Sequence, residues 1–331
     1  MDPRILHRLR CPVCGEPLAE TTAGTARALR CPRRHSFDIA RQGYVNLLAG
    51  RAPHAGDTAE MVAARADFLA AGHYDVISAA LAAAATDAVS RLLATRPRPT
   101  PPVPQPPTDT TVSGQSRGTD GGAAEQTTAA VRAEPAPDVD AYPLVVDAGA
   151  GTGRYLGAVL AALPDAVGLA LDVSKPALRR AARAHPRAAA ALADTWQRLP
   201  LADASTAVLL NVFAPRNGAE FHRVLDPAGT LLVVTPDTDH LAELVDALDL
   251  LRVDPDKADR VTDSLGAHFT PTGSAVHRAE LTLTRPEAAS LVGMGPSAWH
   301  TDPDALASQL AALPEPVRVT VAVRVEAYRP H

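Results

Sequence analysis

A glycine-rich turn at residues 149–153 constrains the fold of this chain more than any other feature. It follows the apolar run Leu144–Val146 and Asp147, and it leads into an apolar stretch at 156–163 that is typical of a helix. A strand, a glycine turn and a helix N-terminus together form a nucleotide-binding corner at the carboxyl edge of a parallel sheet. Glycine at 149, 151 and 153 allows the backbone to approach a ligand where a Cβ would intrude.

The spacing of these glycines indicates the class of nucleotide. A dinucleotide fingerprint, G-x-G-x-x-G, would need glycine where Arg154 stands, and no Gly-Lys-Ser/Thr follows as a phosphate-binding P-loop would require. An acid two residues before G-x-G-x-G suits S-adenosylmethionine, because the ammonium group of its methionine half is cationic and needs no phosphate cradle. Another nucleotide and a purely structural glycine turn remain the alternatives at this point.

Strand and helix patterns alternate regularly on both sides of this turn. Five apolar runs typical of strands are each followed by acids or turn residues; these runs lie at 144–146, 167–171, 188–193, 207–211 and 229–235. Two further runs, at 281–284 and 317–325, resemble a closing antiparallel pair. This order predicts an α/β fold, a Rossmann-like, doubly wound and mostly parallel sheet.

Acidic residues end three of these predicted strands. Asp172 can accept both ribose hydroxyls of an adenosyl group, and Asp194 can accept the adenine amino group. Asp147 lies beside the glycine turn, where it orders the turn or meets the cofactor's ammonium through water. Ligands of open α/β sheets bind at these strand ends, although acids also serve there as ordinary helix caps.

The three cysteines of the chain lie near its start. With one histidine they give the pattern C-x2-C-x16-C-x3-H, formed by Cys11, Cys14, Cys31 and His35. Three thiolates and an imidazole fill four tetrahedral positions, so the spacing predicts a closed, structural Zn²⁺ site. A disulfide would leave one thiol unpaired in a chain without secretory features.

Charge is divided unevenly along the chain. Residues 1–51 contain nine arginines and four acids, a net charge of +5, whereas the whole chain carries −5 and the remainder therefore −10. A locally basic segment around a zinc knuckle favours contact with RNA phosphates, and Phe37 or Tyr44 would be able to stack on a base. An ordinary solvated basic face is the alternative for Arg30, Arg33 and Arg34.

The remaining segments define the domain organisation. Asp57 and Glu60 are expected to form a capping box for a helix that ends at Gly72, and a second helix is expected over 76–93. No apolar run approaches the length of a membrane span and the N-terminus lacks a signal-peptide pattern, so we expect a soluble, cytoplasmic protein without membrane contact. We expect four parts: a zinc-binding RNA-recognition domain (1–51), a helical connector contributing to the cofactor site (52–95), a disordered Pro/Thr/Gly-rich insertion (96–140) and a methyltransferase domain (141–331).

These motifs together resemble the bacterial 23S ribosomal RNA (guanine-N1)-methyltransferases, and especially their Gram-positive branch, which includes tylosin-resistance enzymes. The resemblance covers nearly the whole chain except 96–140. It is carried by the zinc pattern with Pro32 and Phe37-Asp38, by segments 43–48 and 56–74, by the glycine turn, and by 171–175, 211–217, 235–241 and 294–299. Ala150 and Thr152 stand where the enterobacterial branch usually has Cys and Glu, which supports the Gram-positive assignment and a neighbouring guanine as the target.

The resemblance implies an S-adenosylmethionine-dependent enzyme that methylates N1 of a guanine in a hairpin loop of 23S ribosomal RNA, as a homodimer, with macrolide resistance as one expected outcome. It places Tyr74, Gly151, Thr152 and His240 on the cofactor. Together with the strand-end acids and the first glycine, the expected cofactor-binding set is Tyr74, Asp147, Gly149, Gly151, Thr152, Asp172, Asp194 and His240.

The loop after the fourth predicted strand is the candidate substrate site. Its position predicts that Asn211, Phe213, Ala214 and Pro215 bind and stack the guanine, whereas no residue is nominated as a general base. Two rival functions remain: a related enzyme that methylates a small metabolite, and a zinc-dependent RNA-binding module whose methyltransferase domain is inactive.

Overall fold

The computed structural model describes residues 1–24, 26–50, 56–95, 142–250, 264–294 and 302–331. The expected insertion at 96–140 and most of the 294–299 motif lie outside the described residues. Eleven strands are described: β1 (Ala19–Ala23), β2 (Ala26–Arg30), β3 (Ser36–Asp38), β4 (Tyr44–Asn46), β5 (Leu144–Ala148), β6 (Val167–Asp172), β7 (Ala188–Leu192), β8 (Thr206–Val212), β9 (Leu225–Pro236), β10 (Phe269–Leu283) and β11 (Val317–Pro330).

The helices alternate with the strands in the second half of the chain. In the described segments they are α1 (Pro3–Leu6), α2 (Ala59–Ala70), α3 (Asp75–Thr95), α4 (Arg154–Ala162), α5 (Lys175–Ala181), α6 (Gly218–Val224), α7 (Ala242–Ala247), α9 (Arg285–Gly293) and α10 (Pro303–Ala312).

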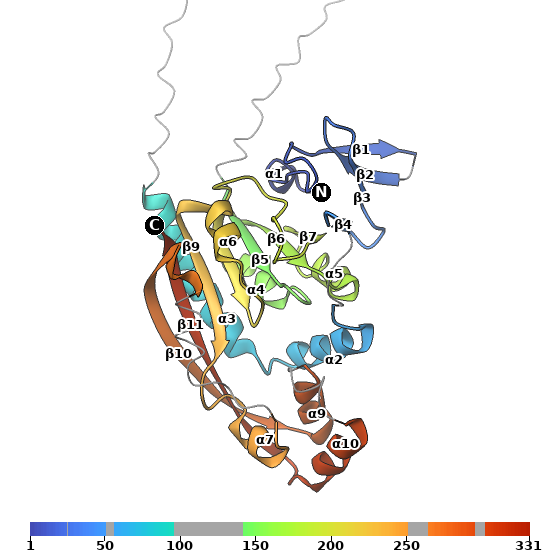
Figure 1. Ribbon diagram of the computed structural model, residues 1–331. Helices are drawn as coiled ribbons and strands as arrows, with labels where there is room; N and C mark the ends of the chain where they lie inside the picture. The colour runs from blue at the N-terminus through green and yellow to red at the C-terminus, as the bar shows by residue number, and fades with distance from the viewer. Residues whose placement is uncertain (25, 51–55, 96–141, 251–263, 295–301) are drawn as a thin grey trace, which may run out of the picture.

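A central sheet of eight strands organises the molecule (Figure 1). Its order is β10-β11-β9-β8-β5-β6-β7-β4; the pairs from β9 to β4 are parallel, whereas β11 is antiparallel to both β9 and β10. The strand order reverses at β5, which lies between β6 and β8. The predicted fold class is therefore confirmed, and the glycine turn after β5 lies at the topological switch point, where such sheets bind ligands.

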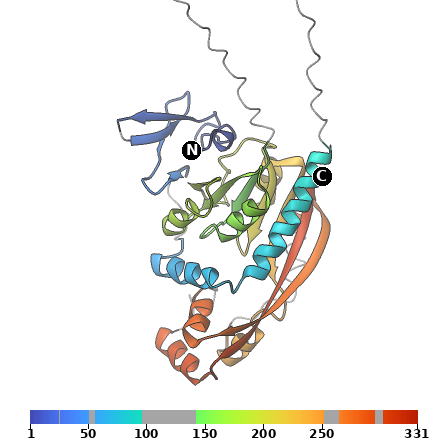
Figure 2. The same ribbon diagram turned by 180° about the vertical axis from the view of Figure 1, so that it is seen from behind.

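Two apolar layers cover the sheet. Helices α3, α4 and α5 bury Leu81, Leu156 and Leu178 on one face, whereas α1 and α6 bury Ile5 and Phe221 on the other. Figure 2 shows α3 crossing the back of the sheet along β9 and the antiparallel pair β10 and β11. Strands β5 and β8 are thus buried along their whole length, which explains their runs of aliphatic residues.

The first 50 residues are joined to this sheet rather than set apart from it. Strands β1, β2 and β3 form a small antiparallel sheet, but β4 pairs with β7 in parallel as the edge strand of the central sheet. Leu9 bridges to Leu201, and the Arg8 guanidinium donates to the Tyr142 carbonyl oxygen at 2.7 Å. The N-terminal part therefore has a fixed position at the β7 side of the sheet (Figure 1).

Two local expectations need correction. The N-cap of α2 is Thr58, whose hydroxyl accepts from the Met61 amide at 3.3 Å, whereas Asp57 turns away to pair with Arg65; the expected Asp57–Glu60 capping box is wrong. The statement that no apolar run reaches the length of a membrane span is wrong as well. Helix α3 is by length and composition apolar enough to cross a membrane. Its alanine-rich surface instead packs on α4 and β9, as a core helix does.

Candidate cofactor, substrate and zinc sites

The predicted zinc ligands converge in the N-terminal part. The ligand atoms of Cys11, Cys14, Cys31 and His35 all lie within 4.8 Å of one another. The Cys14 and Cys31 sulfurs are 3.7 Å apart, and His35 Nδ1 is 3.5 Å from the Cys11 sulfur and 3.3 Å from the Cys31 sulfur. A tetrahedral Zn²⁺ with ordinary bond lengths requires S···S edges of about 3.8 Å and S···N edges of about 3.6 Å. The four residues therefore fit a closed structural zinc site.

The basic side chains near this site are exposed, whereas its aromatic side chains are not. Arg30, Arg33 and Arg34 face solvent. Tyr44 in β4 instead points into the core, with 8% of its surface exposed. Phe37 is half-buried against the second core cluster. The suggestion that Tyr44 stacks on a base is wrong, because a strand that joins the central sheet places one side of its residues in the core.

The three glycines of the turn meet different surroundings. A Cβ at Gly149 would lie 2.4 Å from the Ala214 Cβ, and one at Gly153 would lie 2.9 Å from the Ala181 Cα in α5. A Cβ at Gly151 would meet nothing closer than the Arg65 Nη1 at 3.8 Å. Only the middle glycine therefore faces open space, whereas the first abuts the substrate loop and the third allows α4 to pack on α5.

Asp172 fastens the turn to the next βα unit. Its carboxylate accepts from the Gly151 amide and from the Ser174 amide, both at 2.8 Å. Burial raises the pKa of Asp172, and the two amide hydrogen bonds oppose that rise. A carboxylate offers about four acceptor positions, so two remain for the hydroxyls of a ribose. A cavity of about 430 Å³ opens beside it, lined by 173–176, Asp57 and the end of β4.

Asp147 is the most strongly perturbed carboxyl group beside the turn. It is fully buried, and neither oxygen has a well-formed hydrogen bond in the described part of the chain. Burial raises its pKa to about 7; the nearby Asp172 carboxylate adds to the rise, and the Leu156 amide opposes it. An uncompensated buried carboxylate needs a cationic partner, which an ammonium group would supply.

Asp194 has one oxygen in a local turn and one without a partner. Its Oδ1 accepts from the Trp196 amide at 3.0 Å, whereas its buried Oδ2 has no hydrogen-bond partner among the described residues. An exocyclic amino group would satisfy that oxygen. The orphaned oxygens of Asp147 and Asp194 and the open side of Gly151 therefore fit an S-adenosyl group with its methionine half at the turn.

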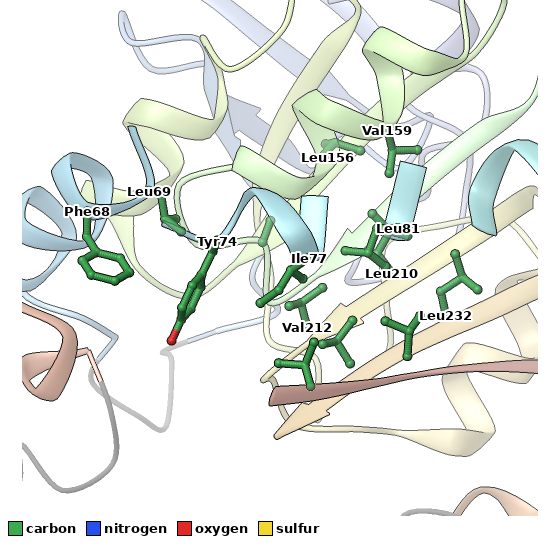
Figure 3. Packing of buried hydrophobic residues seen from close by; sticks show 14 of the residues in the cluster. Phe68, Leu69, Tyr74, Ile77, Leu81, Leu156, Val159, Leu210, Val212 and Leu232 are labelled. Atoms are coloured by element: carbon green, nitrogen blue, oxygen red, sulfur yellow. The ribbon is translucent and has the colours of Figure 1, made fainter. Parts of the chain in front are cut away.

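Three aromatic rings from distant parts of the sequence meet at the same edge. The centroids of Tyr74, Phe213 and His240 lie 6.1 to 6.4 Å from one another. In Figure 3, Tyr74 stands between Phe68 and Ile77 at the end of the core that α3 covers. Burial raises the pKa of Tyr74, so its hydroxyl keeps its proton at neutral pH. The His240 Nδ1 accepts from the Ala322 amide of β11 at 3.2 Å.

The candidate substrate loop is shaped by Asn211. This residue is buried, and its side-chain nitrogen donates to the Ala148 carbonyl at 3.2 Å and the Pro215 carbonyl at 2.9 Å. The bonds join the loop to the strand that precedes the glycine turn. Phe213 has a left-handed φ of 52°, and 43% of its surface is exposed. Ala214 contacts the glycine turn through its methyl group.

Sequence reasoning did not assign a role to Arg65 of α2. Its guanidinium reaches the turn from a helix some ninety residues earlier in the chain, a contact that no local pattern reveals. Its arginine identity and its place in segment 56–74 were the only available signals.

A Rossmann-like methyltransferase with an N-terminal zinc ribbon is the class that this fold and these sites define. The zinc-ribbon family model described as "RlmA, N-terminal" matches residues 9–52. A Micromonospora griseorubida protein named as a 23S rRNA (guanine-N(1)-)-methyltransferase is 62% identical over the full length of both chains. The 23S rRNA (guanine(748)-N(1))-methyltransferase of Streptomyces fradiae is 45% identical over 100% of this chain and 99% of its own. This chain belongs to the 23S rRNA (guanine-N1)-methyltransferase family.

More distant similarities extend to a further sequence relative and to solved structures. A Bacillus subtilis relative of the same named activity is 28% identical and covers 89% of this chain and 88% of its own. Among solved structures, a Thiobacillus denitrificans methyltransferase in complex with S-adenosyl-L-homocysteine is 16% identical with a TM-score of 0.37, covering 57% of this chain and 86% of that chain. The family membership rests on the sequence relatives.

Proposed function

We propose that this protein transfers a methyl group from S-adenosylmethionine to N1 of a guanine in a hairpin loop of 23S ribosomal RNA. The observation that carries the proposal is the similarity to the Streptomyces fradiae enzyme, which runs through 100% of this chain and so includes the zinc site and the carboxyl edge. By the same similarity, the target is the guanine that corresponds to position 748. Resistance to tylosin-type macrolides is the expected consequence for a cell that contains the modified ribosome.

The cofactor is proposed to lie along the carboxyl edge from β5 to β7. Asp147 faces its ammonium, Asp172 accepts from its ribose hydroxyls, and the Asp194 Oδ2 accepts from its adenine amino group. The buried oxygens of Asp147 and Asp194 that lack hydrogen-bond partners among the described residues support this placement. Gly149, Gly151 and Thr152 form the floor under its methionine half, and Tyr74 and His240 flank it. When bound, the cofactor supplies an electrophilic methyl group on a sulfonium.

The target guanine is proposed to enter beside Phe213. Its N1 carries a proton and lies on the Watson–Crick edge, so the base must be unpaired when it reacts. The exposed Phe213 ring offers a stacking face, and the Ala214 and Pro215 backbone borders it. A bound cofactor would supply the methyl group to N1 in exchange for its bond to sulfur, and the N1 proton would have to be released. Asn211 acts as a positioning residue, because its amide holds the loop against β5.

The N-terminal part is proposed to hold the RNA hairpin. Its exposed Arg30, Arg33 and Arg34 lie around the second zinc knuckle, and residues 1–51 carry a net charge of +5. Phosphate contacts of this kind position an RNA without reading its sequence. Two copies of the chain are proposed to frame the RNA between their zinc domains, in a soluble, cytoplasmic homodimer.

Primer extension tests the function directly. Ribosomal RNA from a host that expresses the protein should show a reverse-transcription stop at the guanine equivalent to 748, and RNA from a host without it should not. The Asp172→Ala variant is the control, because it loses the clasp on Gly151 and should abolish the stop. Methylation at another guanine would contradict the target, and methylation of no RNA would contradict the function.

The role of Asn211 has its own test. The Asn211→Ala variant should bind S-adenosylhomocysteine with nearly normal affinity but methylate RNA far more slowly, because the loop is no longer joined to β5. Unchanged methylation by Asn211→Ala, beside loss of methylation in Asp172→Ala, would show that Asn211 has no role in the substrate site.

A further inference from the structure

Arg65 lies directly over the open side of the glycine turn. It projects from α2, and its Nη1 is 3.8 Å from the position of a Cβ on Gly151, nearer than any other non-neighbouring atom. About a quarter of the side chain is exposed. The other two glycines of the turn are closed off by Ala214 and Ala181. Among the three glycines, only Gly151 has an open side, and Arg65 lies at that side.

Two protein contacts hold the guanidinium in this place. One terminal nitrogen donates to the Asp57 carboxylate, and the other donates to the Met294 carbonyl oxygen at 3.3 Å. A guanidinium has five N–H groups in a rigid plane, so these two contacts leave further donors for a third acceptor. Asp57 in turn is fixed by the Ser174 hydroxyl, which donates to its carbonyl oxygen at 2.9 Å.

The charges around the turn are arranged in two groups. Asp172 accepts from the Gly151 amide and Asp147 interacts with Asp172, whereas the cationic Arg65 lies at the open side of Gly151. Burial raises the pKa of Asp172, and the positive charge of this guanidinium is one of the contributions that oppose the rise. The methionine half of the proposed cofactor carries an ammonium and a carboxylate on one carbon. A site for it requires both an anion and a cation near the turn, and these residues provide both.

We propose that Arg65 binds the carboxylate of the cofactor's methionine half over Gly151, while Asp147 faces the ammonium. The inference rests on the proposed use of S-adenosylmethionine and adds a cofactor-binding residue from the connector helix. Charge-assisted hydrogen bonds from arginine to a carboxylate are the stronger class, so we expect the contact to contribute about 10- to 100-fold in affinity. A purely structural role, as a clasp between α2 and Met294, is the competing explanation.

Calorimetry with two ligands separates these explanations. S-adenosylmethionine and decarboxylated S-adenosylmethionine share the adenosyl, sulfonium and ammonium groups and differ in the carboxylate. The wild-type protein should prefer the intact cofactor by at least tenfold. In Arg65→Gln, affinity for the intact cofactor should fall about 10- to 100-fold, while affinity for the decarboxylated ligand stays the same or rises, because a repelling cation has been removed.

Arg154→Gln is the matched control. Arg154 follows the same turn and its loss changes the net charge equally, but its guanidinium pairs with Asp75 at 2.5 Å. This variant should retain the wild-type preference, and Arg65→Lys should retain part of it. An equal loss for both ligands in Arg65→Gln, or no loss for either, would overturn the assignment of Arg65. Failure of the wild-type protein to bind either ligand would instead refute the use of this cofactor, and with it the proposed function.

Discussion

Asp147→Asn is expected to stabilise the cofactor-free protein in a strongly pH-dependent way. The carboxyl group is fully buried without a well-formed hydrogen bond, and its pKa is raised from 3.8 to about 7. The folded protein therefore binds this proton more tightly than the unfolded chain does, and stability is lost as pH rises from about 4 to 7. At ~1.36 kcal/mol per pH unit, the stability lost relative to low pH is about 2 kcal/mol at pH 5 and about 4 kcal/mol at pH 8.

Urea denaturation of both proteins at a series of pH values measures this penalty. The variant has no charge at this position, so the difference in the free energy of unfolding should widen by roughly 2–3 kcal/mol between pH 5 and pH 8. Effects of titrating groups that do not interact with Asp147, such as the zinc ligands, cancel in that difference. A difference that does not change with pH would refute the conclusion that the Asp147 carboxylate is buried without compensation.

Three further predictions concern the turn, the loop and the zinc site. Gly149→Ala should destabilise the protein by about 2–4 kcal/mol in urea denaturation, because its Cβ would lie 2.4 Å from that of Ala214. At Gly151 the added Cβ would meet only Arg65, so Gly151→Ala should destabilise the protein by about 1 kcal/mol. The same variant should weaken the binding of S-adenosylhomocysteine measured by calorimetry. Equal destabilisation by the two would contradict this difference. Phe213→Ala should leave the melting temperature within a few degrees but reduce RNA methylation at least tenfold; an undiminished primer-extension stop would exclude it from the substrate site. Cys31→Ala should lower the zinc content measured by atomic absorption from one per chain and unfold β1 to β3, detected by proteolysis; full retention of metal would contradict the four-ligand site.

Local sequence patterns predicted the features that depend on local geometry. The zinc ligands come in two pairs, each within a short turn, so their spacing alone indicates a metal site. Strand β5 and the glycine turn follow each other directly, and the acids Asp172 and Asp194 stand at or just after strand ends. Such features are readable because covalent connection fixes where the side chains lie relative to the backbone.

The edge strands of the central sheet and the contacts between distant segments were not predicted. Residues 44–46 were assigned to a separate domain, but β4 forms the edge of the central sheet and buries Tyr44. Strand β10 is fifteen residues long, although only its last residues had the apolar pattern of a buried strand. An edge strand lies against the core along only part of its length, so its polar portion gives little signal in the sequence.

The sequence by itself determined the metal ligands, the order of the βα units and the placement of the glycine turn with its acids. Only the tertiary structure decided that Tyr74, Phe213 and His240 meet, that Asn211 is bonded inward, and that Arg65 covers Gly151. The first group depends on residues joined by a few bonds. The second depends on how helices and loops pack across the sheet, which is set by burial of the whole core rather than by any neighbouring residues.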